Sequence, residues 1–174
     1  MERHSTKLDL AFLLKAPLFC DNRGTFNRLF CQDKLLKLGL DNCFVQSNLC
    51  INSKAGILRG LHYQRKPYEE TKIVTCLTGS IYDVIVDLRP NSSTYLQWQG
   101  FELSSPDTSI YVPKGFAHGY QTLSDNAIIH YSVSEFYKPN SEDGLHYNDP
   151  KLAIQWKVPV SCISDKDNSW PKLD

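Results

Sequence analysis

The sequence has no net charge, no long apolar run and no region of low complexity. Its 174 residues include 19 Lys and Arg and 19 Asp and Glu, so the formal net charge is zero. A protein that neutralises nucleic-acid phosphates usually has a basic excess, so we expect no nucleic-acid partner. No apolar run approaches the length of a membrane span, so we expect no membrane partner. Nothing divides the chain, which predicts one domain over residues 1–174.

The six cysteines show no C-x-x-C spacing, which argues against the commonest metal and redox motifs. They are dispersed, and Cys76 for example lies in an apolar run, which is typical of free thiols in a reducing compartment. The apolar segment 8–19 is interrupted by Asp9 and Lys15 and is followed by no small-residue cleavage site. We therefore expect a cytoplasmic protein without disulfides.

What the sequence does contain is a series of short β-branched and aromatic runs separated by turn residues. Residues 33–38 form the one good helix candidate, ended by Gly39. Residues 72–78 and 81–88 flank a Gly-Ser turn and are interpreted as a hairpin. Further strands are predicted over 95–103, 109–113 and 127–137. The pattern predicts an all-β fold, an antiparallel jelly-roll sandwich or barrel with few helices and an open mouth for a ligand.

Two histidines stand in positions that suggest chemistry. His62 ends the segment GILRGLH, and His118 follows the Pro-Gly turn of PKGFAH. If the first segment is extended, His62 and Gln64 share one face and Arg59 and Leu61 the other. This arrangement resembles the metal-binding pattern of cupins, in which Glu69 or Glu70 would be a third ligand. The second histidine of that pattern is replaced by Gln64, so we expect no metal and acid–base work instead.

The order of several short motifs resembles the dTDP-4-dehydrorhamnose 3,5-epimerases, a metal-independent family of cupin-like barrels. The resemblance runs from about residue 19 to residue 167. Each motif is modest alone, and their order is specific. The motifs are DNRGTF at 21–26, QSN at 46–48, GILRGLHYQ at 56–64, KIV at 72–74, GSIYDVIVDLR at 79–89, PKGFAHG at 113–119, NDP at 148–150 and SDKD at 164–167.

The resemblance implies epimerisation at C3, C5 or both of a nucleotide-linked 4-keto-6-deoxyhexose, without a cofactor, in deoxysugar and surface-polysaccharide biosynthesis. These carbons flank a carbonyl, so the reaction needs a base, an acid for the opposite face and a donor for the enolate oxygen. By resemblance His62 is the base, paired with Asp167. Tyr131 is the acid, and Lys72 is the cation near the enolate. A metal-dependent cupin enzyme and a non-catalytic sugar-binding barrel are the alternatives.

The resemblance also implies how the substrate is held. Asp83 lies on the same face of its predicted strand as Ile85, where an unpaired carboxylate would be costly. It is therefore expected to pair with His118. Family members are typically homodimers that exchange N-terminal strands, so a second copy is the expected partner besides the nucleotide sugar. The substrate contacts implied are Arg23, Gln46, Ser47, Asn48, Arg59, His118, Glu142 and Lys166.

One departure from the family pattern concerns the nucleotide. The early motif usually continues to a glutamate that contacts the base, and this chain has Arg28 there. Arginine offers donors where glutamate offers an acceptor, and cytosine N3 and O2 are both acceptors. This predicts a preference for a CDP-linked sugar, unless Arg28 points into solvent or reaches the diphosphate. Cys50, where serine is usual, and Ser132, where lysine is common, are further departures.

Overall fold

The computed structural model describes residues 1–173, and its regular secondary structure is almost entirely antiparallel β-sheet. The strands are β1 (Glu2–Ser5), β2 (Phe12–Lys15), β3 (Leu18–Asp21), β4 (Gly24–Asn27), β5 (Gln46–Asn52), β6 (Leu58–Gln64), β7 (Lys72–Thr78), β8 (Ile81–Asp87), β9 (Trp98–Leu103), β10 (Thr108–Val112), β11 (Phe116–Thr122), β12 (Ala127–Val133) and β13 (Glu142–Gly144). The helices are α1 (Gln32–Lys37), the 3-10 turn η1 (Pro139–Ser141) and α2 (Asp165–Asn168). The predicted all-β class is confirmed.

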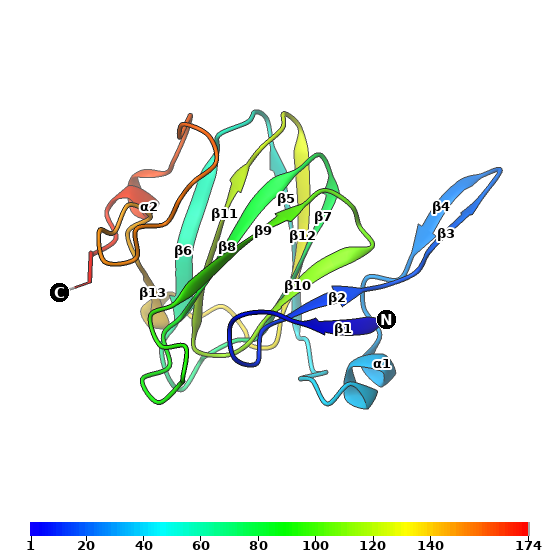
Figure 1. Cartoon of the computed structure of the whole chain (residues 1–174), viewed down its shortest axis with the longest axis horizontal. Coiled ribbons are helices and arrows are strands. Elements are labelled where there is room, and N and C mark those ends of the chain that lie inside the picture. Colours follow the sequence, from blue (N-terminus) through cyan, green and yellow to red (C-terminus); the bar gives the residue numbers. More distant parts are fainter. Residues whose placement is uncertain (174) are drawn as a thin grey trace.

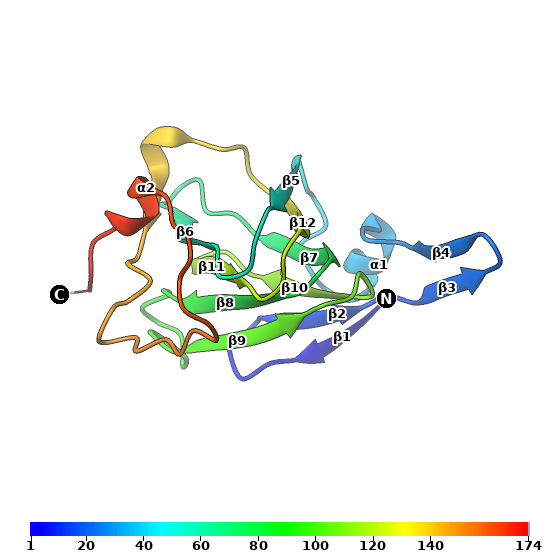
Figure 2. The same ribbon diagram turned by 90° about the horizontal axis from the view of Figure 1, so that it is seen from above.

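Two sheets form the body of the molecule. One has the strand order β1-β2-β10-β7-β12-β5, and the other has the order β13-β6-β11-β8-β9. The pair β3–β4 forms a separate arm that projects from one end, while α2 and the C-terminal segment lie at the opposite end (Figures 1 and 2). Within residues 1–173 no helix is long and apolar enough to cross a bilayer.

The predicted hairpin of β7 with β8 is wrong, because the two strands lie in different sheets. β7 pairs with β10 and β12, whereas β8 pairs with β9 and β11. Both strands are mostly buried, so each needs a partner along both edges. Gly79 at φ +78° turns the chain from one sheet into the other. A Gly-Ser turn therefore marks the reversal without saying which strands pair.

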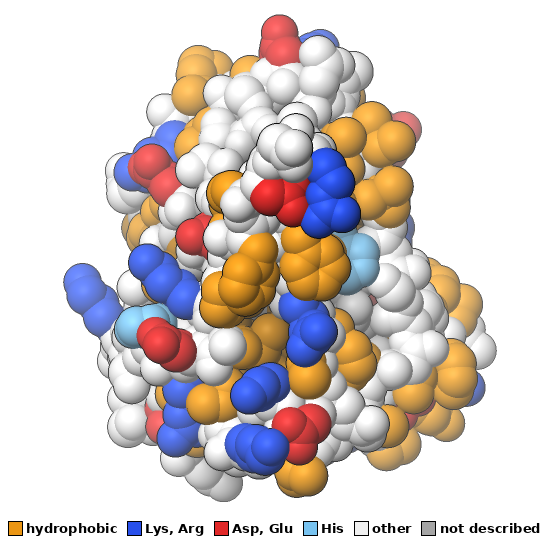
Figure 3. Space-filling view, turned by 90° about the vertical axis from the view of Figure 1, so that its right-hand side faces the viewer, with side chains coloured by type: hydrophobic (Ala, Val, Ile, Leu, Met, Phe, Trp, Pro, Cys, Tyr) orange, Lys and Arg blue, Asp and Glu red, His pale blue; other side chains and the backbone are white. Residues whose placement is uncertain are grey.

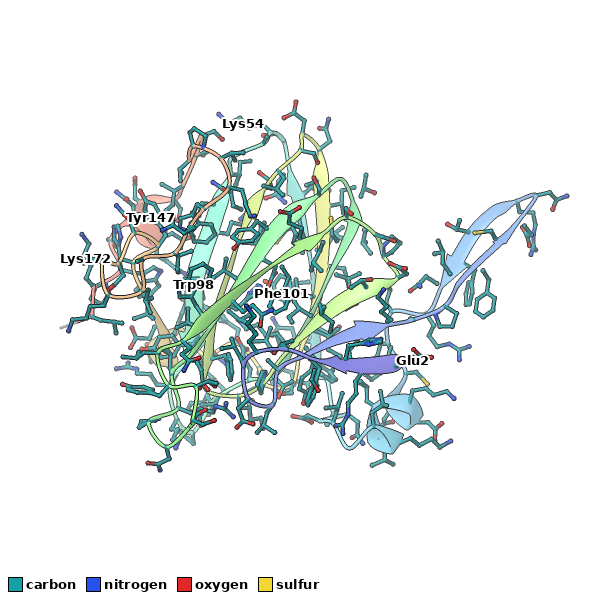
Figure 4. All side chains as sticks on the ribbon, in the orientation of Figure 1. Glu2, Lys54, Trp98, Phe101, Tyr147 and Lys172 are labelled. Carbon is teal, nitrogen blue, oxygen red and sulfur yellow. The ribbon has the colours of Figure 1, made fainter. Side chains whose placement is uncertain are left out.

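The core lies between the sheets and is continued on the outer side of β8. Ile81 and Ile85 pack in the inner cluster, in which Phe101 of β9 also lies (Figure 4). Val84 and Val86 point the other way, into a second cluster covered by the C-terminal segment. The side chains of β8 thus alternate between two covered faces, and both faces carry buried apolar residues.

Several predicted boundaries change. The helix is confirmed as α1, but it ends at Lys37 rather than residue 38, shortly before Gly39 at φ +68°. β9 begins at Trp98 rather than residue 95, because residues 92–97 turn around the buried carboxylate of Asp87. β12 ends at Val133 rather than residue 137, and the chain beyond it turns toward the rim of the sandwich, where the amide of Tyr137 bonds Gln46.

Candidate active site

Two adjoining hollows open between the sheets, each of about 370 Å³. They share four residues, which are His62, Lys72, Tyr131 and Lys166. The shared residues come from β6, β7, β12 and α2, so strands of both sheets and the C-terminal segment meet here. These are residues that the resemblance implied, and the fold brings them to one place.

The imidazole of His62 is bonded to the carboxylate of Asp167. Nε2 of His62 lies 2.7 Å from Oδ1, while Oδ2 accepts from the backbone N–H of Gly60 at 3.0 Å. Ser164 caps α2 and holds the Asp167 amide at 3.1 Å. Burial acts to raise the pKa of Asp167, but the hydrogen bond and charge of His62 outweigh it and leave that pKa below its usual value. The carboxylate is therefore ionised at neutral pH.

A second histidine–carboxylate pair lies deeper in the sandwich. Nε2 of His118, on β11, lies 2.8 Å from Oδ2 of Asp83, on β8. The Asp83 side chain is fully buried, and His118 lines one of the hollows. The expected partnership between these two residues is confirmed.

The predicted faces of β6 need one correction. Arg59 lines the same hollow as His62, although the two are three positions apart and strict alternation would place them on opposite faces. The reason is a bulge: His62 and Arg59 pair with His118 and Tyr120, which are only two residues apart. The extra residue on β6 returns Arg59 to the inner face.

Tyr131 faces His62 from the other sheet. It lies on β12 in the six-stranded sheet, and His62 lies on β6 in the five-stranded sheet. Burial raises the pKa of the Tyr131 phenol to about 12, and the nearby Glu70 carboxylate adds to this effect. The phenol is therefore protonated at neutral pH and can donate a proton.

The charged groups of the hollows pair almost completely. Three carboxylates each hold one basic group; these pairs are Glu70 with Lys72 at 2.9 Å, Glu142 with Lys166 at 2.7 Å and Asp167 with His62 at 2.7 Å. Nε of Arg59 donates to the side-chain Oδ1 of Asn52 at 3.0 Å, and within residues 1–173 Arg59 forms no ion pair with a carboxylate. The positive charge of the Arg59 guanidinium is thus not neutralised by a carboxylate of the described chain, which suits it to bind an anionic ligand.

The segment 46–48 only partly faces the hollow. Gln46 and Asn48 line it, as the resemblance implies. Ser47 points to the outer face, where its hydroxyl lies 2.7 Å from Nε2 of His130. Ser47 thus does not line the hollow of its own chain, because neighbouring residues of a strand face opposite sides, and its predicted contact with substrate stays a prediction.

Arg23 and Arg28 do not reach the hollow of their own chain. Arg23 sits at the exposed turn of the β3–β4 arm, where its guanidinium bonds Asp21 at 3.1 Å. Arg28 directly follows the arm and is exposed. The arm extends away from the sandwich (Figure 1), so the predicted contact of these two arginines with substrate is not formed within one chain and stays a prediction.

Several lining residues had no functional prediction from the sequence. Tyr137 donates from its hydroxyl to Glu142 at 2.7 Å and closes one side of the hollow. Glu70, considered only as a metal ligand, instead pairs with Lys72. Within residues 1–173 no three His, Cys, Asp or Glu side chains form a metal-sized cluster. Other unpredicted lining residues are Cys50, Tyr63, Gln64 and Tyr120.

The chain is similar to one family of nucleotide-sugar enzymes along almost its full length. A family model for dTDP-4-dehydrorhamnose 3,5-epimerase matches residues 5–174. The enzyme of that name from Escherichia coli is 40% identical over 172 residues, which cover 97% of this chain and 92% of the relative. The enzyme from Methanothermobacter thermautotrophicus is 39% identical over 173 residues, covering 97% and 92%.

Solved structures give the same result. The dTDP-4-dehydrorhamnose 3,5-epimerase of Bacillus anthracis, with TDP and pyrophosphate bound, superposes with a TM-score of 0.95 at 42% identity and covers 99% of both chains. The Legionella pneumophila enzyme, in complex with dTDP-4-keto-L-rhamnose, superposes with a TM-score of 0.91 at 38% identity, covering 97% of this chain and 90% of the other. These superpositions show that the chain has the same cupin-like fold as the solved epimerases.

Proposed function

This chain belongs to the dTDP-4-dehydrorhamnose 3,5-epimerase family, and we propose that His62 and Tyr131 carry out its reaction. The enzyme is a carbohydrate epimerase of nucleotide-sugar biosynthesis, acting on C3, C5 or both of a 4-keto-6-deoxyhexose. One observation carries the assignment of the two residues: they line one hollow from opposite sheets. Epimerisation removes a proton from one face of a carbon and returns one to the other, which this opposition suits.

The proton transfers follow from the groups present. Asp167 is ionised and can only accept, so Nε2 of His62 carries a proton and Nδ1 is free to act as base. Abstraction of the C–H proton turns the adjacent C4 carbonyl into an enolate, whose negative charge lies largely on the C4 oxygen. The Tyr131 phenol then protonates the carbon from the opposite face. One inversion leaves His62 protonated and Tyr131 ionised, and exchange with solvent restores both.

Lys72 is proposed to stabilise the enolate oxygen. Its ammonium group lines both hollows and is almost buried, so it acts where the effective dielectric constant is low. A cation fixed beside an oxygen that gains charge stabilises the transition state more than the ground state. This selective stabilisation is what proton abstraction next to a carbonyl requires.

The remaining polar groups are proposed to hold the nucleotide diphosphate and the sugar. Arg59 suits a phosphate, because its guanidinium forms paired hydrogen bonds and it contacts no carboxylate within the described chain. Burial acts to lower the pKa of Lys166, but Glu142 outweighs it and raises that pKa, so this lysine also keeps its charge. The further proposed contacts are Gln46, Asn48, His118 and Glu142.

A second copy of the chain is the proposed partner, and its arm would supply Arg23 and Arg28. The arm leaves Phe19 61% exposed and Phe26 59% exposed, which is unusual for large apolar side chains. Figure 3 looks onto this side of the molecule, where hydrophobic side chains gather beside Lys and Arg. A two-fold pair of arms would bury these side chains and bring the arginines to a neighbouring site.

The direct test of the activity is a panel of 4-keto-6-deoxyhexoses linked to dTDP, CDP, UDP and GDP, incubated with the enzyme in D₂O. We expect deuterium at C3, C5 or both, accompanied by inverted product, with at least one nucleotide. Failure to exchange with every member of the panel would overturn the proposal.

A further inference from the structure

Glu70 forms a nearly buried ion pair with Lys72 in the wall of the hollow. Oε1 of Glu70 lies 2.9 Å from Nζ of Lys72, and the two side chains are only 11% and 10% exposed. Buried charges persist only when they are paired and hydrogen-bonded, so this carboxylate fixes where the ammonium group lies.

The carboxylate is itself held in place by a rigid neighbour. The amide of Gln64 donates to Oε2 of Glu70 at 3.3 Å. Gln64 is buried, donates to the Tyr68 carbonyl at 2.9 Å and accepts from the Lys138 amide at 2.7 Å. These contacts join the end of β6 to the loops before β7 and after β12. The position of Glu70 is therefore set by the scaffold and passed on to Lys72.

The same carboxylate lies near Tyr131. Lys72 pairs with Val133 and Val74 pairs with Tyr131 in adjacent strands, so Lys72 and Tyr131 are diagonal neighbours on the inner face. Besides burial, the charged or titratable groups that act on the Tyr131 phenol are Cys50 on β5, Glu70 before β7, Arg59 on β6 and Glu142 on β13. Arg59 favours the ionised phenol, and the other three oppose it.

We propose that Glu70 is a positioning residue of the epimerisation: it aims the Lys72 ammonium at the enolate oxygen. This inference rests on the roles proposed above for Lys72 and Tyr131. A lysine side chain has four rotatable methylene groups, so an unheld ammonium would spend much of its time away from the oxygen. Glu70, which the sequence suggested as a possible metal ligand, would thus act on the reaction by holding Lys72.

The test is a double-mutant cycle of Glu70→Gln and Lys72→Met, measured as deuterium uptake in D₂O and as inverted product. Glu70→Gln keeps the side-chain shape and removes the charge. We expect it to lower kcat for exchange by about 10-fold with KM within about two-fold, at the lower end of the range for a charge-assisted hydrogen bond. In the Lys72→Met background the same change should have less than a two-fold effect, because Glu70 would act through Lys72.

Two further measurements separate positioning from a structural role. The alkaline limb of the inversion profile should move to lower pH in Glu70→Gln, because a carboxylate that disfavours the ionised phenol is gone. Glu69→Gln removes the adjacent charge outside the hollows and should change neither rate nor profile. If Glu70→Gln does not fold, Glu70→Asp keeps the charge but shortens its reach, and it should also slow exchange.

Equal losses from Glu70→Gln in both backgrounds, or an unshifted alkaline limb, would overturn the inference. If wild type exchanges deuterium normally and Glu70→Gln exchanges it at the same rate, the role of Glu70 alone is overturned. A wild type with no exchange on any substrate would instead overturn the proposed function.

Discussion

Nε2 of His62 lies 2.7 Å from Oδ1 of Asp167, across 105 residues of sequence. The base is therefore completed only when the C-terminal segment folds back onto β6. The carboxylate is kept ionised and is fixed by the Gly60 amide, so it determines both the tautomer and the orientation of the imidazole.

Asp167→Asn should leave the fold intact and slow proton exchange by about 10²–10⁴-fold, as in other histidine–carboxylate pairs. The carboxamide can donate to Nε2, which moves the imidazole proton to Nδ1 and removes the basic lone pair. Rates of deuterium uptake and thermal midpoints of the two proteins provide the check. A variant within a few-fold of wild type would show that the pair does not tune the base.

Tyr131→Phe should reduce inversion far more than exchange. His62 can still remove the proton, but the enolate is then reprotonated from the same face. The measurement is the ratio of washed-out label to inverted product. Parallel loss of both would argue that Tyr131 holds the substrate rather than returning the proton.

Asp87→Asn should weaken the fold in a pH-dependent way. Burial acts to raise the pKa of this carboxyl, but Arg89, Ser92 and Thr94 outweigh it and lower the pKa from 3.8 to about 2. A lowered folded-state pKa stabilises the fold above about pH 4, and this contribution is lost as pH falls to 2.

At pH 7 we therefore expect Asp87→Asn to lower the free energy of unfolding by about 2 kcal/mol, a gap that closes toward pH 2. Urea unfolding at several pH values measures it. Asp33→Asn, which removes an exposed carboxylate paired with Lys37 on α1, is the control and should change the curve far less than Asp87→Asn does. A gap that stays constant with pH would assign the loss to packing.

The preference for one nucleobase of the substrate over another is tested with Arg28→Glu. If a second copy's arm brings Arg28 to the base, wild type should have a higher kcat/KM for a CDP-linked than for a dTDP-linked form of the same sugar. The variant should then shift toward dTDP by about 10-fold, because buried donors and acceptors would be re-matched. A wild type that prefers dTDP, with no shift in the variant, would show that Arg28 does not read the base.

The fold class could be predicted because short alternating runs and turn residues are local properties. The partnership of His118 with Asp83 was expected because a buried carboxylate needs a partner. The sheet assignments of β7 and β8 could not be predicted, because a two-residue turn fits either a hairpin or a crossing. The inner position of Arg59 could not be predicted either, because it depends on a bulge against β11.

Other parts of the site depend on contacts that sequence order hides. The pairing of Glu70 with Lys72 is visible only once the loop before β7 is placed beside Gln64. The positions of Arg23 and Arg28 depend on an arm that leaves the sandwich altogether. A motif implied that these arginines bind substrate, but it could not say in which copy.

The role of His62 as the catalytic base is tested most directly by deuterium exchange of the same 4-keto sugar in D₂O with His62→Asn and with wild type. We expect wild type to incorporate deuterium at the inverted carbon and the variant, folded and of similar thermal midpoint, to incorporate none above the uncatalysed rate. Exchange in His62→Asn at more than a few per cent of the wild-type rate would contradict the assignment of the base.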